Sequence, residues 1–232
     1  MLKYIERIPT QTDAIFTDCI IDHAHPITPI RSLYPVHKKE IAAHLLSLDT
    51  NDRYLRFGYS AQDAQIMAYA EKLNFERDDV FGIFDADLNL QAIAHLAFDS
   101  KDASSAEFGV SVLKSARGKG YGSSLFERAV IHARNQGVEM MYIHALSENT
   151  TMIKIARDAG AIVERDGSES AAYLQLPEAT LSSRLGEVFH EQWAMSDYRF
   201  KVQANFVNTV ASGIHGYATD LTNAALAGIQ TP

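Results

Sequence analysis

Residues 111–125, SVLKSARGKGYGSSL, combine three glycines at alternate positions with three cationic side chains and no carboxylate. An apolar run typical of a strand comes before the glycines, and a helical pattern follows them. The first backbone N–H groups of a helix have no partner within the helix, and the helix dipole adds partial positive charge there. Glycine lets an anion approach without interference from a Cβ atom. The stretch therefore predicts an anion-binding loop, with phosphate as the expected ligand.

Two common phosphate-binding motifs fit this loop poorly. A Walker A loop requires lysine followed by serine or threonine, but Lys119 is followed by Gly120. The dinucleotide fingerprint is G-x-G-x-x-G, whereas the glycines here give G-x-G-x-G, and no acidic residue ends the next strand. A plain glycine turn between strand and helix is the other alternative, but it does not explain why three cations accompany the three glycines.

Glu107 is the candidate general base, because it opens the strand that leads into the loop. Strand alternation divides the neighbouring residues between two faces: Glu107, Gly109 and Ser111 on one, and Phe108, Val110 and Val112 on the other. A carboxylate beside a small residue on a mainly apolar strand suits a base that faces a cleft. The alternative is an ordinary charged residue at the end of a strand, exposed to water.

The elements that must hold the loop follow from the hydrophobic pattern. The expected strands are residues 27–34, 80–84, 90–98, 106–113, 140–145, 162–164 and 171–176. The expected helices are residues 36–48, 61–73, 123–136 and 149–159. Helices, an antiparallel meander and then a β-α-β-α-β order indicate an α/β protein with a mixed sheet.

Composition excludes several classes of function. The net charge of −8 disfavours nucleic acid and anionic membranes as partners. The single cysteine, Cys19, excludes an internal disulfide and any multi-cysteine metal site, and His23 and His25 lack a third metal ligand. No apolar run approaches the roughly 18 residues of a membrane span, and the N-terminus does not resemble a signal peptide. We therefore expect a cytoplasmic protein without a metal site.

The loop and two further segments resemble a known family. Residues 117–122, RGKGYG, match the R/Q-x-x-G-x-G/A signature of the GNAT acyl-CoA-dependent N-acetyltransferases. Residues 149–160, NTTMIKIARDAG, are similar to a later helix of that family, and residues 27–35, ITPIRSLYP, look like its first strand. There is also some likeness to the GNAT domains of bacterial protein-lysine acetyltransferases. The resemblance implies the GNAT fold, a mixed and mostly antiparallel central sheet flanked by helices.

This resemblance implies that acetyl-CoA is the co-substrate and that its pyrophosphate lies on the loop. Arg117 would frame the loop, and the strand before it would be splayed from the next strand by a bulge, with the amide near Val112 stabilising an oxyanion. The pantetheine arm would pair with Val110 and Val112. The residues implied to donate their amides to the pyrophosphate are Gly118, Lys119, Gly120, Tyr121, Gly122 and Ser123. Asn149 would either contact the cofactor or only cap its helix.

The resemblance also supports Glu107 as the base, but it leaves the acid open. Many family members carry a tyrosine on the last helix that protonates the departing thiolate, and here that position is Ala156. Tyr121 and Tyr142 lie nearby in the sequence without an assigned role. His144 is expected to satisfy a buried hydrogen bond, with a place in the lining of the acceptor site as the alternative.

The implied acceptor is a primary amine, either of a small molecule or of a protein lysine or N-terminus. Residues 51–57, NDRYLRF, resemble the region that borders the acceptor site, so Tyr54, Arg56 and Phe57 either contact substrate or form a packed turn. The main expectation is direct acetyl transfer in a ternary complex. The alternatives are a non-catalytic acyl-CoA sensor and an assembly module on the same scaffold.

The expected organisation has three parts: an extension at residues 1–25, the acetyltransferase domain at residues 26–176 and a helical extension at residues 177–232. Residues 202–232 contain one charged side chain, Asp220, although apolar residues recur there at helical spacing. Such a segment is poorly solvated alone, so we expect it to bury itself against the domain or to build a homo-oligomer.

Overall fold

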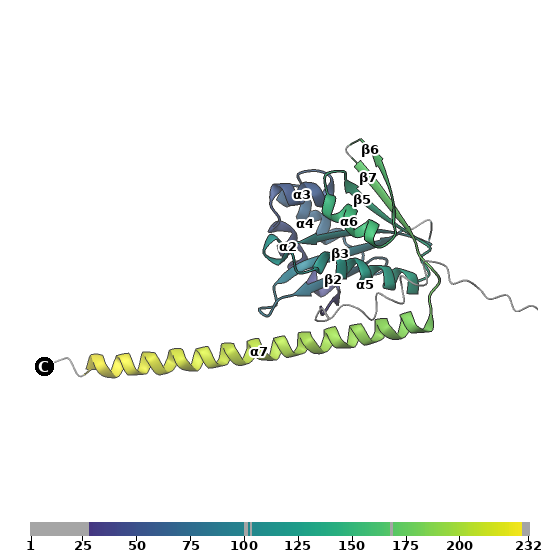
Figure 1. Cartoon of the computed structure of the whole chain (residues 1–232). Helices are drawn as coiled ribbons and strands as arrows, with labels where there is room; N and C mark the ends of the chain where they lie inside the picture. The colour runs from purple at the N-terminus through teal and green to yellow at the C-terminus, as the bar shows by residue number, and fades with distance from the viewer. Residues whose placement is uncertain (1–27, 100–101, 103, 168, 229–232) are drawn as a thin grey trace, which may run out of the picture.

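Apolar strands form one sheet in the computed structural model, which describes residues 28–228 apart from residues 100–101, 103 and 168. The expected extension at residues 1–25, with Cys19, lies outside the described residues. The seven strands follow the order β1-β2-β3-β4-β5-β7-β6 (Figure 1). They are β1 (Arg31–Leu33), β2 (Asp79–Phe84), β3 (Leu90–Phe98), β4 (Ser105–Val112), β5 (Met140–Leu146), β6 (Ile162–Asp166) and β7 (Glu169–Gln175). Neighbouring strands are antiparallel except β4 and β5, which are parallel.

Helices cover both faces of the sheet because the strands alternate apolar side chains between two cores. Phe81 and Phe108 pack on the side of α5 and α6, whereas Val80 and Ile93 pack on the side of α2 and α4. The helices are η1 (Pro35–His37), α2 (Lys38–Leu46), α3 (Thr50–Phe57), α4 (Asp63–Lys72), η2 (Lys114–Ala116), α5 (Tyr121–Asn135), α6 (Thr150–Asp158) and α7 (Leu181–Gly228). This mixed, mostly antiparallel sheet between helices is the fold class predicted from the sequence.

The two central strands separate along their length. β4 pairs with β3 from Ala106 to Val112 without a shift in register, but it pairs with β5 only from Ser105 to Glu107. β5 continues to Leu146 in partnership with β7. The predicted splay is therefore present. The predicted bulge is not seen in the β3–β4 register, so the divergence begins simply where the β4–β5 ladder ends.

Residues 181–228 form one continuous helix, α7, within the helical extension that the sequence predicted. Its 48 residues correspond to a length of about 72 Å. Its first part lies along α5 and β1, and the rest extends past the domain (Figure 1). Its contacts with the domain include the Arg31 guanidinium 3.7 Å from the Tyr198 ring centroid and a hydrogen bond from Lys201 to the Phe84 carbonyl. Within the described part of the chain, no helix is long and apolar enough to cross a membrane.

His132 on α5 joins α7 to the sheet. Its Nδ1 bonds Glu187 of α7 and its Nε2 lies 2.8 Å from Asp79 of β2. Burial alone would lower the pKa of His132, but the two carboxylates outweigh burial and raise it to about 9. Burial likewise opposes ionisation of Glu187, yet hydrogen bonds from His132, Arg128 and Asn135 lower its pKa to about 2. The imidazolium and its two carboxylates therefore clamp the long helix onto the domain.

We expect His132→Gln to lower the free energy of unfolding by about 1–3 kcal/mol near neutral pH, because two carboxylates lose a charged donor. A histidine whose pKa is raised on folding stabilises the folded state fully when the pH is below its unfolded pKa of 6.5. This stabilisation is lost as the pH rises through about 9. The difference in the free energy of unfolding between wild type and variant, measured with denaturant from about pH 6 to about pH 10, should therefore shrink as the pH rises.

His144→Gln is the matched control, because the His144 side chain is exposed on β5 and makes no hydrogen bond among the described residues. It should leave the pH dependence unchanged. A constant difference between wild type and His132→Gln across this range would contradict a charged clamp.

Candidate functional site

The loop between β4 and α5 presents a row of unused amides. Gly118 and Gly120 have φ angles of 76° and 77°, and Gly120 is the N-cap of α5. The first amide that bonds within this turn is that of Ser124, which donates to the Gly120 carbonyl. None of the N–H groups of residues 118–123 donates a hydrogen bond among the described residues, and no side chain caps the helix. The loop therefore has the free donors that anion binding requires.

Two cations of the loop are tied to α3. Arg117 Nη2 lies 2.6 Å from Oδ1 of the buried Asp52, and Lys114 pairs with Asp49. The hydrogen bond from Lys114 lowers the pKa of Asp49, whose side chain also caps α3 by accepting the Asp52 N–H. These pairs fix the loop against α3 and neutralise part of the positive charge that the sequence placed there. Lys119 has no ion pair in the described part of the chain, and its Nζ lies 5.9 Å from the Tyr121 ring centroid.

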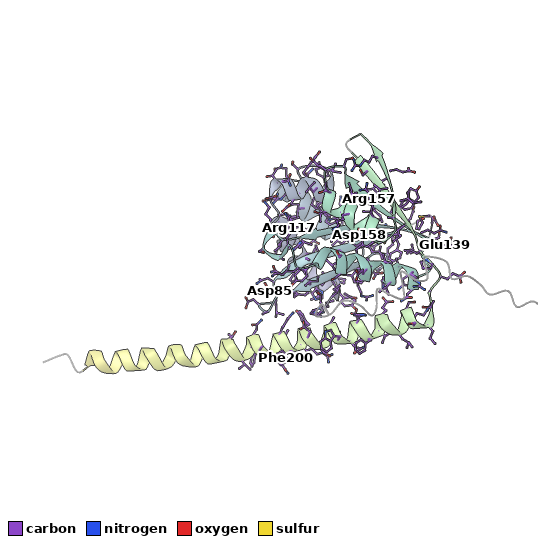
Figure 2. All side chains as sticks on the ribbon, in the orientation of Figure 1. Asp85, Arg117, Glu139, Arg157, Asp158 and Phe200 are labelled. Atoms are coloured by element: carbon purple, nitrogen blue, oxygen red, sulfur yellow. The ribbon has the colours of Figure 1, made fainter. Side chains whose placement is uncertain are left out.

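A cleft of ≈ 520 Å³ opens beside this loop, between α3, β4 and the starts of α5 and α6. Nine of the residues predicted to bind the cofactor line it: Val110, Val112, Arg117, Gly118, Gly120, Tyr121, Gly122, Ser123 and Asn149. Lys119 and Glu107 do not line it. Figure 2 shows Arg117 and Asp158, two residues of this cleft, on the part of the domain away from α7.

Sequence reasoning missed part of the cleft wall. The additional residues are Leu48, Asp52, Leu55, Ser111, Ala116, Thr151, Met152, Lys154, Ile155 and Asp158. Several come from α3, which was not predicted as a helix because its sequence, TNDRYLRF, has few apolar residues. The signal that was available is the pair of helix ends, Asp49 as N-cap and Gly58 with a φ of 78° as C-cap.

A buried histidine lies behind Ser111, a residue of the cleft. Nδ1 of His44 lies 2.8 Å from the Leu90 carbonyl, and its Nε2 lies 2.9 Å from Ser111 Oγ on β4. Burial lowers the pKa of His44 to about 4, so the ring is neutral near pH 7. A neutral ring donates through Nδ1 to the carbonyl and accepts the serine hydroxyl at Nε2. This pair holds β4 against α2 without adding charge to the cleft.

Asn149 caps its helix, which is one of the two roles that the sequence left open. Its side-chain oxygen accepts the Met152 N–H at 3.1 Å and so caps α6. Its amide nitrogen makes no hydrogen bond among the described residues, and the residue lines the cleft. Capping therefore uses the oxygen and leaves the nitrogen available to a ligand.

The candidate acid–base residues lie at different places. Glu107 is exposed where β4 and β5 begin to diverge, opposite Tyr142, which is also exposed. Ala156 is fully buried in the core beneath α5, whereas Tyr121 lines the cleft.

The prediction of a buried hydrogen bond for His144 was wrong, because this side chain is exposed. Of the α3 residues, Arg56 lines the cleft and Phe57 packs against the core of α2 and α4.

Comparison with known proteins gives a consistent result. Residues 43–161 match the model of the acetyltransferase (GNAT) family. The structure is similar to the GNAT domain of Streptomyces lividans PAT, at 18% identity and a TM-score of 0.55, covering 63% of this chain and 89% of that one. It also resembles a GNAT-family acetyltransferase from Streptococcus pneumoniae, at 15% identity and a TM-score of 0.52, covering 64% and 98%.

A third similar structure is spermidine N-acetyltransferase from Vibrio cholerae in complex with CoA and spermine, at 19% identity and a TM-score of 0.51, covering 63% and 94% of the two chains. At these identities the similarity establishes a shared fold. A comparison with curated protein sequences gave no match.

We expect Gly120→Ala to weaken binding of coenzyme A about tenfold. The left-handed backbone at this position costs a residue with a Cβ about 1–2 kcal/mol, and the backbone change that relieves this strain reorients the loop amides. Isothermal titration with coenzyme A measures the change.

Gly137→Ala is the control, since Gly137 has a φ of 88° with open space around it at the other end of α5. It should lower the melting temperature by a similar amount and leave the affinity for coenzyme A unchanged. Equal affinities for wild type and Gly120→Ala would show that the ligand does not lie on this loop.

Proposed function

Because the chain belongs to the GNAT acetyltransferase family, we propose that it transfers an acetyl group from acetyl-CoA to a primary amine in a ternary complex, with Glu107 as the general base. Acetyl-CoA is the co-substrate of this family. The acceptor is an amine of a small molecule or of a protein. The observation that carries the proposal is the row of six unpartnered amides, residues 118–123, at the head of α5 and beside a cleft.

The residues of the cleft fit the parts of acetyl-CoA. The amides of residues 118–123 suit its diphosphate, because a helix N-terminus binds anions through its free N–H groups. Gly122 suits the close approach of a ligand to the backbone. Space around it is tight, since a Cβ at this position would lie 3.3 Å from Ile155. The backbone of Val110 and Val112 lies beyond the end of the β4–β5 ladder, so an extended pantetheine arm can add to the edge of β4. The free amide nitrogen of Asn149 offers one more donor.

Bound acetyl-CoA supplies a thioester carbonyl, an electrophile for a neutral amine. Alkyl amines are protonated near pH 7, so the acceptor must lose a proton before it reacts. Glu107 takes this proton, directly or through a water molecule, at the point where β4 and β5 separate. Because Ala156 is buried and a thiol is a good leaving group, we propose that departure of the thiol does not depend on an acid at this position.

Glu107→Gln is expected to lower kcat at least about a hundredfold with little change in the KM for acetyl-CoA, since the amide cannot accept the proton. Release of free thiol with a working acceptor, followed over pH, measures the effect.

Glu139→Gln provides the control, because Glu139 is also an exposed glutamate and its contacts use the backbone only (Figure 2). It should retain full activity. Full activity of Glu107→Gln over the whole pH range would remove Glu107 from the mechanism.

We also propose that the outward face of α7 pairs two copies of the chain. Its inner face bonds the domain, whereas its other sides expose nine large apolar side chains among the residues whose side chains the structure describes. They are Leu181, Leu185, Val188, Phe189, Trp193, Phe200, Val202, Phe206 and Val207. Because α7 extends past the domain, two copies can pair along this helix while the acidic domains, with a chain charge of −8, stay apart. The function of residues 177–232 is then to assemble the enzyme.

Phe200→Asp is expected to raise the dimer dissociation constant at least about tenfold, because a twofold interface would bring two buried carboxylates together. Phe200 is 73% exposed on α7 (Figure 2), and light scattering over a range of concentrations gives the mass.

Val36→Asp, at an apolar side chain that is equally exposed but lies on η1, should leave the mass unchanged. A wild-type chain that stays monomeric at all concentrations would contradict self-association.

A further inference from the structure

Arg56 is a half-buried arginine of the cleft that has no carboxylate partner among the described residues. Three other cations nearby are paired, Arg53 with Asp63, Lys114 with Asp49 and Arg117 with Asp52, whereas Lys119 of the loop does not line the cleft. Lys154, on the opposite wall, is exposed to water. An arginine that has lost part of its water and has no counterion is a ready partner for an anionic ligand.

The guanidinium of Arg56 lies against the backbone of β4. A Cβ placed on Gly109 would come within 2.9 Å of its Cζ and Nη2. The glycine at this position therefore lets the arginine lie directly on the strand. Its Cζ also lies 5.2 Å from the Phe57 ring centroid and 5.6 Å from that of Tyr69, so aromatic rings border the charge.

A chain of polar contacts orients this guanidinium. Nη2 of Arg56 donates to the Tyr69 hydroxyl at 2.9 Å, and the hydroxyl lies 2.8 Å from Nδ1 of His95. Nε2 of His95 lies 3.3 Å from Asp78 Oδ2, and Asp78 is held by Arg77 at 2.6 Å and 2.7 Å. Burial first, and then the charge of Arg56, lower the pKa of His95. The ring therefore accepts the tyrosine proton at Nδ1, while its buried Nε2 lies near Asp78 without the geometry of a hydrogen bond.

This chain leaves the charge of Arg56 uncompensated. Its positive field also contributes to the lowered pKa of His44, after burial, so the buried ring behind Ser111 is neutral. Gly109 is two residues from Glu107 on the same face of β4, a spacing of about 7 Å along the strand. An acceptor with its ammonium group at Glu107 and a carboxylate at Arg56 would therefore lie along this face of β4.

The geometry points to a carboxylate subsite at Arg56, and hence to an acceptor that carries both an amine and a carboxylate, such as an amino acid. This inference rests on the proposed function, since it assumes that Glu107 marks the position of the amine. Arg56 binds the carboxylate, and Tyr69 is a positioning residue that holds the guanidinium in place. A polyamine, which has only cationic groups, would face an uncompensated arginine here and is disfavoured. The phosphates of CoA are the other anion that Arg56 can reach.

The experiment compares amines that differ only at the carboxylate. L-amino acids and their carboxamides are assayed singly by thiol release with acetyl-CoA, and their binding to the CoA-saturated protein is followed by saturation-transfer NMR, which does not depend on turnover. We expect the wild type to prefer the carboxylates about tenfold or more in kcat/KM, mostly through KM. Arg56→Gln should abolish this preference while the affinity for coenzyme A stays within about twofold.

Two further variants test the geometry without removing the charge. Gly109→Ala should displace the flexible guanidinium and reduce the preference, because its Cβ meets Arg56. Tyr69→Phe should raise the KM for carboxylates severalfold and leave the KM for carboxamides unchanged. Arg157→Gln removes the same charge from an exposed site outside the cleft, labelled in Figure 2, and should match the wild type.

The outcomes separate the two proposals. Carboxamides that react and bind as well as carboxylates would overturn the subsite and leave the acetyltransferase intact. A loss of coenzyme A affinity in Arg56→Gln, with the preference retained, would assign Arg56 to the cofactor phosphates. If no amine releases thiol, the proposed function fails. The subsite is then tested by the NMR measurement alone: binding of carboxylates that is lost in Arg56→Gln supports it, and binding that is unchanged in this variant overturns it.

Discussion

Unpaired backbone amides at the head of α5 are the constraint on which the rest of the structure depends. Leaving six N–H groups without protein partners costs stability unless water or a ligand satisfies them. The surrounding structure keeps them available: two glycines adopt left-handed angles, and Arg117 is anchored on the buried Asp52 of α3. The ends of α3 and of the β4–β5 ladder then set the size of the cleft that these amides face.

Charge pairing explains how an acidic chain maintains a site for anions. Carboxylates from α3 hold two of the loop cations, so attraction for a diphosphate depends mainly on N–H groups and the helix dipole. Arg56, in contrast, is held by a neutral hydroxyl and keeps its charge for a ligand. A second group of paired charges, around His132, serves a different purpose, because it attaches α7 far from the cleft. Each cluster has one evident structural task.

Local patterns in the sequence predicted the strand, loop and helix around the glycines, because their signals lie within a few residues of one another. Residues 51–57 were expected to border a site, but the helix α3 that contains them was not predicted, since that helix is defined by its ends and not by an apolar stripe. The contact of Arg56 with Gly109, and the chain through Tyr69 to His95, join segments far apart in sequence and follow only from the packing of α3 and α4 on the sheet. The position of α7 against the domain was likewise not evident from the sequence, because its docking depends on the contact of Glu187 with His132 of α5.

Backbone amide NMR of the full chain tests the central claim most directly. Coenzyme A is titrated into ¹⁵N-labelled protein, with acetyl-pantetheine, which lacks the diphosphate, as the comparison ligand. The account predicts large shifts of the Gly118, Gly120 and Gly122 amide resonances with coenzyme A and small ones with acetyl-pantetheine. Saturation by coenzyme A without movement of these three resonances would contradict it.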